Sequence, residues 1–303
     1  MQTGLARREF LKISGLAALG ACTTKLAATS SQQPTSPTPG NLEFVFFTDI
    51  HLQPELHGTE GSEKCFRQIA ALKPAFALCG GDLVFDANKV PEERAKLLYD
   101  LYSNTEHLLD VPLHRTIGNH DVFNLAGSSG KKMYEDRFGA TYSSFDQGGY
   151  HFVLLDSVFL TDDHDWEGRV SPEQLAWLAA DLARIGPNAP VIITTHIPLV
   201  TAYTCYRPPS TKPLTKSYLT VANAAEVLKV IEPYRVIAVL QGHTHVNEVV
   251  SYKGCDFITS GAVCGDWWKG PRLGFPEGFS VISLRGGKLE HRYETFGWQA
   301  RSS

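Results

Sequence analysis

The sequence predicts an α/β fold in which strands and helices alternate and potential metal ligands gather at the carboxyl ends of the strands. Two observations support this fold class. Short apolar runs, typical of strands covered on both faces, alternate with longer stretches in which apolar residues recur at helical spacing. Asp49, Asp82 and Asn119 directly follow such runs and recur at the length of a strand-helix-strand unit. Such units bring strand ends to one edge of a sheet, where ligand clefts form.

The first half of the expected domain contains three predicted strands and two predicted helices. Leu42 to Thr48 is a nearly continuous apolar run and predicts the first strand. A helix is predicted from Ser62 to Leu72, because apolar residues recur there at helical spacing and Pro74 follows. The remaining elements are strands at 75–79 and 113–117 and a helix at 91–109.

The second half continues the pattern and ends in a series of strands. Ser171 and Pro172 predict the start of a helix that extends to Ile185, with Ser171 as its N-cap. Residues 197–220 form a long Pro/Thr/Tyr-rich segment, and loops of that length are often functional. The turn at 285–287 predicts a hairpin. The other predicted elements are strands at 150–156, 191–195, 236–240, 246–252, 256–259, 279–284 and 288–293, and a helix at 221–231.

The first forty residues are predicted to lie outside the fold. Arg7 and Arg8 begin a twin-arginine pattern, and the apolar stretch that follows is too short to span a bilayer. It ends in a sequence that resembles a bacterial lipobox, with Cys22 as the residue to be lipidated, although an ordinary signal peptide is the alternative. We therefore expect a signal peptide at 1–21, a disordered Ser/Thr/Pro-rich tether at 22–40 and the folded domain at 41–303. Export would place the protein in the periplasm or another extracytoplasmic compartment.

Charge and cysteine content restrict the partners that we expect. The formal net charge of -4 gives no electrostatic footprint for nucleic acid or an anionic membrane. Membrane attachment is therefore expected only through a lipid on Cys22. Cys255 and Cys264 fall on adjacent predicted strands and could form a disulfide, but the sequence does not establish their geometry.

Five short motifs carry residue types that commonly bind metal ions. Alone, each motif is weak, since a single histidine is usually a surface or core residue. In an extended chain, residues i and i+2 point the same way, so the two ends of a D-x-H or H-x-H motif can face one ion. The full series is specific, because every motif occurs in order and glycines stand where the backbone must turn beside a ligand. The motifs are Asp49-Ile-His51, Gly81-Asp82, Gly118-Asn119-His120-Asp121, His196 and Gly242-His243-Thr244-His245.

This series resembles the calcineurin-like metallophosphoesterase superfamily over about residues 42–250. The first motif, which contains a histidine, is similar to the subgroup that includes cyclic-nucleotide phosphodiesterases. The resemblance implies a four-layer α/β/β/α sandwich with two mixed sheets and a pair of bound metal ions. Ligands with oxygen and nitrogen donors suit divalent or trivalent Mn, Fe, Zn, Ni or Co. One ion would be held by Asp49, His51, Asp82 and His245, and the other by Asp82, Asn119, His196 and His243, with Asp82 bridging.

The resemblance also implies an activity, which is hydrolysis of a phosphate mono- or diester by a hydroxide that bridges the two ions. His120 would act on the leaving-group oxygen as an acid or a positive hydrogen-bond donor, and Asp121 would orient it. Purple acid phosphatases share this fold but have Gly and Tyr where His51 and Phe85 stand, so their tyrosinate-bound ferric ion is not expected. Phe85, followed by Asp86, also departs from the pattern common among cyclic-nucleotide phosphodiesterases.

Four further residues are candidates for contact with the organic part of a small phosphoester substrate. Trp267 and Trp268 could form an apolar wall, or their rings could instead fix a Gly/Pro-rich loop to the core. Tyr203 and Arg207 could contact a leaving group or phosphate, unless their loop is only a solvated surface.

Two other functions compete with phosphoester hydrolysis. The chain could be a catalytically silent lipoprotein that binds metal or a phosphate ligand through the same fold. It could also be a dinuclear hydrolase of other bonds, although the H-x-H-x-D-H cluster of metallo-β-lactamases is absent from the sequence.

Overall fold

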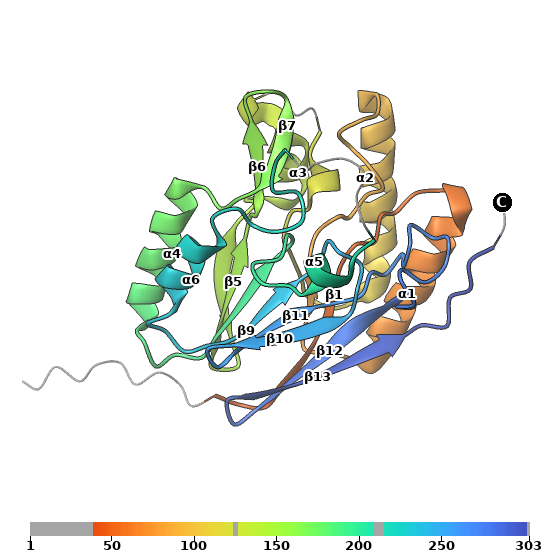
Figure 1. The fold of residues 1–303 in the computed structure, drawn as a ribbon. Helices are drawn as coiled ribbons and strands as arrows, with labels where there is room; N and C mark the ends of the chain where they lie inside the picture. Colours follow the sequence, from red (N-terminus) through yellow and green to blue (C-terminus); the bar gives the residue numbers. More distant parts are fainter. Residues whose placement is uncertain (1–38, 124–126, 209–214, 302–303) are drawn as a thin grey trace, which may run out of the picture. The chain divides into compact units, whose positions relative to one another are not determined.

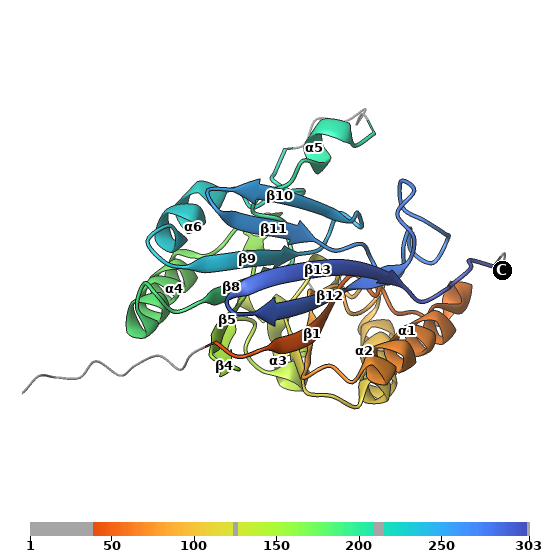
Figure 2. The same ribbon diagram turned by 90° about the horizontal axis from the view of Figure 1, so that it is seen from below.

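Two mixed β-sheets stack face to face, and helices cover their outer faces (Figure 1 and Figure 2). Helices α1 (Gly58–Leu72) and α2 (Glu92–Glu106) lie on the first sheet, whereas α4 (Pro172–Ile185) and α6 (Ala224–Ile231) lie on the second. The predicted four-layer α/β/β/α sandwich is confirmed.

The structure, a computed structural model, describes residues 39–123, 127–208 and 215–301. The predicted signal peptide, Cys22 and all but the last two residues of the predicted tether lie outside this part of the chain. Within the described residues, no helix combines the length and apolar character that crossing a membrane requires.

Both sheets contain a parallel centre with antiparallel strands at an edge. The first has the order β13-β12-β1-β2-β3, in which β1, β2 and β3 are parallel. The second has the order β10-β11-β9-β8-β5-β4, in which β11, β9, β8 and β5 are parallel. The strands of the first sheet are β1 (Leu42–Phe47), β2 (Ala77–Cys79), β3 (Leu113–Arg115), β12 (Gly278–Arg285) and β13 (Lys288–Thr295). Those of the second are β4 (Ser143–Gln147), β5 (Tyr150–Leu155), β8 (Val191–Thr195), β9 (Val236–Gln241), β10 (Glu248–Tyr252) and β11 (Cys255–Thr259).

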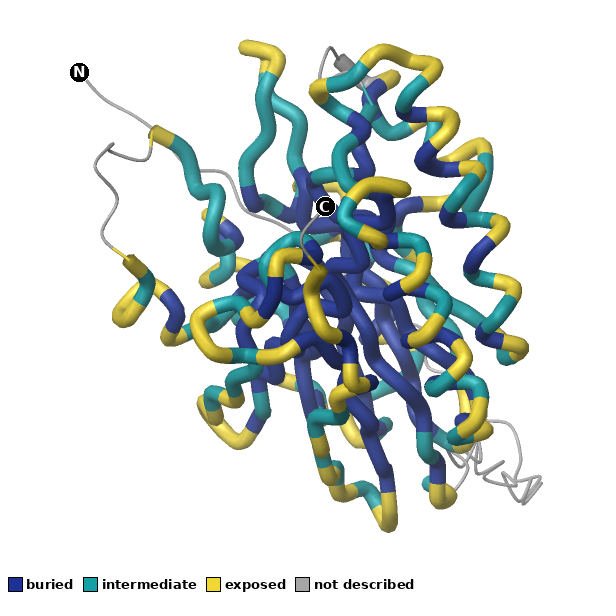
Figure 3. Tube along the Cα trace, turned by 90° about the vertical axis from the view of Figure 1, so that its right-hand side faces the viewer, coloured by how far each residue is buried: buried dark blue, intermediate teal, exposed yellow. Residues whose placement is uncertain are grey.

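Side chains of the central strands alternate between two apolar layers. On β1, Phe44 and Phe46 point into the layer between the sheets. Val45 and Phe47 point into the layer beneath the helices, where Phe47 lies 5.4 Å from Phe66 of α1 between ring centroids. The strands are therefore buried on both faces, as Figure 3 shows for the centre of the domain, and this explains their nearly continuous apolar sequence.

Local capping sets the start of one helix, and tertiary packing sets the start of another. Helix α4 begins as predicted, because Ser171 Oγ accepts the backbone N–H of Gln174 at 3.2 Å. Helix α1 begins at Gly58, earlier than the predicted start. Its glycines weaken the helical signal, but they are needed, since a Cβ on Gly61 would lie 2.2 Å from the ring of Trp268.

Several short elements were not predicted, because they are too short to show a clear period. Among them is the hairpin β6 (Val158–Thr161) and β7 (Asp165–Gly168), which forms a separate two-stranded sheet. The others are β4, α3 (Lys132–Phe138), α5 (Tyr203–Tyr206) and the 3₁₀-helices η1 (Glu55–His57), η3 (Asn119–Asp121) and η4 (Gly127–Lys131). The helix predicted at 91–109 is observed as α2 followed by the 3₁₀-helix η2 (His107–Leu109).

Candidate metal centre and active site

The motif residues follow the carboxyl ends of strands in both sheets. Asp49 and His51 follow β1, and Asp82 follows β2. Asn119 lies in η3, just after β3. The others come from the second sheet, with His196 after β8 and His243 and His245 after β9. Parallel strands within each sheet thus bring residues that are nearly two hundred positions apart to one place.

The first predicted ligand set converges within bonding reach of a single point. His51 Nε2 lies 3.1 Å from His245 Nε2 and 3.4 Å from Asp82 Oδ2. Asp49 Oδ1 lies 3.3 Å from His245 Nε2 and 3.9 Å from His51 Nε2. Ligand atoms bound to one transition-metal ion at about 2.1 Å are separated by similar distances.

The second predicted set shares Asp82 with the first. His196 Nε2 lies 3.2 Å from Asp82 Oδ2 and 3.2 Å from Asn119 Oδ1. Asp82, His196 and His243 offer ligand atoms that all lie within 4.8 Å of one another. The same oxygen of Asp82 therefore faces both sets, which is the position that a bridging carboxylate requires.

The hydrogen bonds of the histidines fit a bound cation. His51 Nδ1 bonds the Phe85 carbonyl at 3.3 Å, and His245 Nδ1 bonds the Gly265 carbonyl at 2.6 Å. With both protons on Nδ1, two Nε2 lone pairs face each other at 3.1 Å, an arrangement that a shared cation satisfies.

The second set has the same character. His196 Nδ1 bonds the Gly80 carbonyl at 2.8 Å, so its Nε2 lone pair faces two oxygen acceptors. His243 Nε2 bonds the Tyr218 carbonyl at 2.7 Å, which leaves Nδ1 for an ion. The donors present in both sets therefore fit transition-metal ions.

Burial and the two carboxylates set the charge of the histidines. Burial lowers the pKa of His51 to about 3 and that of His243 to about 4, so both are neutral at pH 7. Burial also opposes a charge on His196, but the neighbouring Asp82 carboxylate more than offsets it and raises the pKa of His196 to about 9. The pocket thus favours a positive charge beside Asp82.

The backbone around the ligands adopts a conformation that L-residues rarely use. Positive φ angles between 43° and 72° occur at Asp49, His51, Asp82, His243 and His245. Adjacent glycines allow the close approach, since a Cβ on Gly118 would lie 2.2 Å from Asp82 Oδ1. Clusters of such strain are typical of functional sites.

His120 lies beside the first ligand set, but Asp121 does not orient it, and that prediction is wrong. The ring of His120 is 4.6 Å from the ring of His51 between centroids. The Asp121 carboxylate is fully buried and accepts backbone N–H groups instead, from Gly118 at 2.8 Å, Asp82 at 3.0 Å and Leu83 at 2.8 Å. It therefore holds the backbone that carries Asp82.

The carboxylate that faces the His120 ring is Asp86, which was not predicted to have this place. Asp86 Oδ1 lies 3.9 Å from His120 Nδ1, a nitrogen without a hydrogen-bond partner in the described structure. The backbone N–H of His120 donates to Asp82 Oδ1 at 2.8 Å. The position of Asp86 shortly after the Gly-Asp motif was the available sequence signal.

The two adjacent tryptophans have different environments. Trp267 is partly exposed, and its ring lies 4.8 Å from His245 and 5.9 Å from His51 between centroids. Trp268 is 0% exposed, and its indole N–H donates to the His51 carbonyl at 3.0 Å. The prediction that Trp268 contacts substrate is therefore corrected, because this ring fixes the loop to the core.

Tyr203 and Arg207, the two loop residues predicted to contact substrate, also have different environments. Tyr203 is buried, and its hydroxyl is 3.4 Å from Nη2 of Arg272, whose guanidinium lies 5.1 Å from the ring centroid of Trp267. Arg207 caps α5, and no contact recorded for the described residues links it to the ligands. Arg272 was not predicted as a site residue.

A third tryptophan was missed entirely. Trp166 lies in β7, and its ring is 5.9 Å from that of His243 at an interplanar angle of 90°. No feature of the hairpin sequence predicted that the ring of Trp166 lies beside the metal centre.

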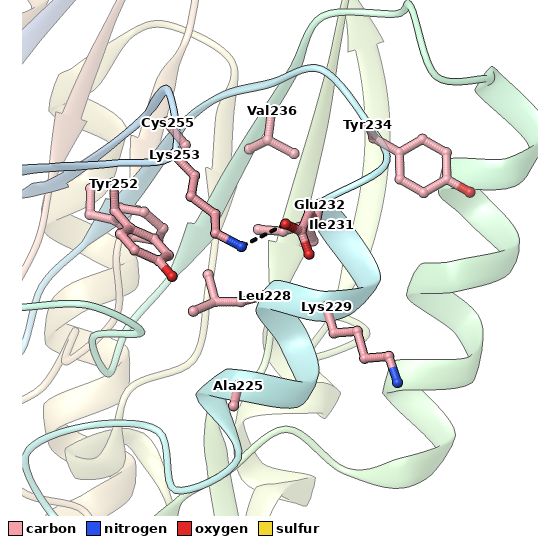
Figure 4. Close-up of a pocket in the computed structure, with 11 residues that line it drawn as sticks. Ala225, Leu228, Lys229, Ile231, Glu232, Tyr234, Val236, Tyr252, Lys253 and Cys255 are labelled. Carbon is pink, nitrogen blue, oxygen red and sulfur yellow. Dashed lines mark hydrogen bonds and ion pairs between the residues drawn. The ribbon is translucent and has the colours of Figure 1, made fainter.

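A separate cavity of about 480 Å³ lies between α6 and the β10–β11 hairpin (Figure 4). Leu228, Tyr252 and Cys255 line it, and an ion pair of Glu232 and Lys253 crosses it at 2.6 Å. It contains none of the predicted ligands, because it lies where β9 begins rather than where it ends.

Cysteines of the described domain do not form the disulfide that the sequence left open. Cys255 and Cys264 are both free thiols. Cys255 lines the cavity just described, whereas Cys264 Sγ lies 3.8 Å from His245 Nδ1.

Comparisons with known proteins agree with this geometry. A family model described as calcineurin-like phosphoesterase matches residues 42–247. The serine/threonine-protein phosphatase CPPED1 of Bos taurus is 29% identical over 226 residues, which cover 73% of this chain and 67% of that protein. A solved dimetal phosphatase from Danio rerio superposes with a TM-score of 0.64 at 16% identity, over 84% of this chain and 96% of that chain. The structure of Plasmodium GAP50 superposes with a TM-score of 0.57 at 16% identity, over 85% of each chain.

Proposed function

Because the chain belongs to the calcineurin-like phosphoesterase family and is a hydrolytic phosphoesterase, we propose that it cleaves phosphate mono- or diesters at the seven predicted ligands. The single observation that carries the proposal is the position of Asp82. Its Oδ2 faces His51 Nε2 at 3.4 Å and His196 Nε2 at 3.2 Å, as a carboxylate shared by two ions would. The family implies divalent metal ions at this place.

When bound, the two ions supply an activated water and positive charge that stabilises the phosphoryl transition state. The protein contributes the orientation of the ligands, through carbonyl bonds to the histidine Nδ1 atoms. His120 contributes a proton donor at the leaving-group oxygen. Its side chain is 26% exposed beside His51, so it can reach a substrate that enters from solvent.

We further propose that the protein is exported by the twin-arginine route and anchored through a lipid on Cys22. Support comes from Arg7, Arg8 and the lipobox-like sequence, which lie outside the described residues. Incorporation of radiolabelled fatty acid into the wild type but not into Cys22→Ser would support the anchor. Equal labelling of both proteins would refute it.

The hydrolytic proposal is tested by turnover and metal analysis of the same preparations. Protein loaded separately with Mn, Fe and Zn is assayed on aryl phosphate monoesters, aryl phosphate diesters and pyrophosphate. Serine and threonine phosphopeptides belong in the panel, because CPPED1 relatives carry that activity in their names. Two bound ions with turnover on at least one ester is the expected result. Two bound ions without turnover on any would favour the silent binding lipoprotein.

A further inference from the structure

Two partly exposed tryptophans flank the metal centre on different sides. Among the predicted ligands, the ring of Trp267 contacts His245 at 4.8 Å and His51 at 5.9 Å, both of the first set. Trp166 contacts His243, a member of the second set, at 5.9 Å. The two indoles therefore stand beside different predicted ligand sets.

Trp267 is held in place at an energetic cost. Its φ of 50° lies in the left-handed region, which L-residues rarely adopt. The buried indole of Trp268 fixes the loop on one side. On the other, Arg272 stacks on the Trp267 ring at 5.1 Å while Asp266 accepts its Nη1 at 2.8 Å. These contacts hold the Trp267 ring in one position beside the first ligand set.

Trp166 is fixed by the segment that also orients His243. Its ring packs edge-on against Tyr218 at 5.2 Å, and the Tyr218 carbonyl accepts His243 Nε2 at 2.7 Å. The base of the hairpin is joined to the same segment, since the Gly168 N–H donates to the Ser217 carbonyl at 2.7 Å. The position of Trp166 is thus coupled to that of a metal ligand.

We propose that these two indoles bind the two organic substituents of a phosphodiester, Trp267 the leaving group and Trp166 the group that stays on phosphorus. The assignment of Trp267 follows from His51, whose ring lies next to both Trp267 and the proposed proton donor His120. A leaving group that departs beside His120 lies on that side of the centre. This inference rests on the proposed function and specifies its substrate class.

The reaction is a hydrolysis that consumes one water. The water oxygen forms a bond to phosphorus and the proton that it loses passes to solvent, while the bond from phosphorus to the leaving oxygen breaks. His120 supplies the proton that the leaving alcohol keeps and is protonated again from solvent. The product is a phosphate monoester that retains its second substituent. Planar aromatic groups, such as aryl rings or nucleobases, suit both indoles, because such groups stack favourably on aromatic side chains.

A binding experiment tests the proposal without requiring turnover. Diphenylphosphinate mimics a diester with two uncleavable aryl groups, whereas phenylphosphonate has one. Their affinities for the Mn-loaded protein are measured by calorimetry in the wild type, Trp166→Leu and Trp267→Leu. Trp177→Phe is the matched control, since Trp177 lies on α4 and packs on Tyr142. Metal content and circular dichroism establish that each variant is folded and loaded.

The expected result is selective. Trp166→Leu should weaken the binding of diphenylphosphinate about tenfold, which corresponds to 1.36 kcal/mol of lost stacking, and should leave the binding of phenylphosphonate unchanged. Trp267→Leu should weaken the binding of both ligands, and Trp177→Phe should weaken the binding of neither. Equal weakening of both ligands by Trp166→Leu, or no weakening of either, would overturn the proposal. Should Trp166→Leu fail to fold, Trp166→Phe replaces it, with diphenylphosphinate affinity expected to fall less and phenylphosphonate affinity to stay constant.

Kinetics separate this inference from the function on which it rests. Wild-type protein that cleaves neither bis(p-nitrophenyl) phosphate nor p-nitrophenyl phosphate with any metal would contradict the proposed function, and binding would still decide the role of the indoles. Where turnover is present, Trp166→Leu should lower kcat/KM about tenfold for the diester only. A wild type that prefers the monoester would contradict the diester assignment alone.

Discussion

The carboxyl ends of the central strands of both sheets and the amino end of β9 hold their polar groups in different ways. At the carboxyl ends, buried carboxylates and imidazole lone pairs face one another at 3.1 to 3.4 Å on a strained backbone. At the amino end of β9, the cavity beside α6 contains a compact ion pair of Glu232 and Lys253, and both side chains are more than half exposed. Only the first arrangement leaves polar groups that need a further partner. Unsatisfied buried charge, rather than empty space, therefore locates the functional site.

Removing the Asp82 carboxylate, which both ligand sets share, should have the largest effect on metal binding and turnover. We expect Asp82→Ala to lose bound metal and to reduce turnover by more than about 1,000-fold, because each tenfold corresponds to 1.36 kcal/mol and metal ions supply several kcal/mol. Inductively coupled plasma mass spectrometry and initial rates measure the two effects. The control is Asp256→Asn, whose carboxylate accepts the Ser251 hydroxyl at 2.5 Å on β10–β11. Full metal occupancy in Asp82→Ala would contradict the bridging role.

Removing the proposed proton donor should reduce turnover less than removing Asp82 does, and the metal ions should stay bound. His120→Gln is expected to lower kcat by about 100-fold or more while both ions stay bound, because general acid catalysis contributes about 10²–10⁴-fold. The effect should shrink for substrates whose leaving group has a low pKa, since these need no proton. His107→Gln on η2 serves as the exposed control. Equal losses on good and poor leaving groups would argue against proton donation.

The metal centre could be predicted because its information is local. Most of the motifs follow a short apolar run, and a glycine directly precedes Asp82, Asn119 and His243, so these positions can be read without knowing the tertiary structure. The two mixed sheets and the four layers came from the resemblance. Local patterns are enough where the chemistry sits at the end of a strand.

Residues whose roles depend on tertiary contacts could not be predicted. Asp121 and Asp86 are both carboxylates near a motif, and only the backbone N–H groups after Asp82 decide that Asp121 is structural. Trp267 and Trp268 are neighbours, and the space above Gly61 decides which one is buried. Trp166 lies in a polar hairpin without a periodic signal, so its position depends wholly on packing.

Truncating the buried Trp268 should mainly reduce the stability of the fold. Trp268→Ala is expected to lower the free energy of unfolding by about 3–5 kcal/mol, as is usual when a large core aromatic is removed. It should also weaken metal binding, because the indole N–H no longer donates to the His51 carbonyl. Urea denaturation of metal-free protein measures the first effect, with partly exposed Trp177→Ala as the control. A loss no greater than that of the control would mean that this ring does not fix the loop.

The ion pair at the opposite cavity should contribute least. The hydrogen bond from Lys253 lowers the pKa of Glu232, so the pair stabilises the fold above the carboxyl's unfolded pKa of about 4.3 and loses that contribution as pH falls through the lowered folded value. Glu232→Gln should therefore reduce stability slightly at pH 7, and not at pH 3 or in 1 M salt, where the pair is protonated or screened. Turnover and metal content should be unchanged. A marked loss of turnover in Glu232→Gln would mean that this cavity communicates with the metal centre, and the contrast between the two regions would no longer hold.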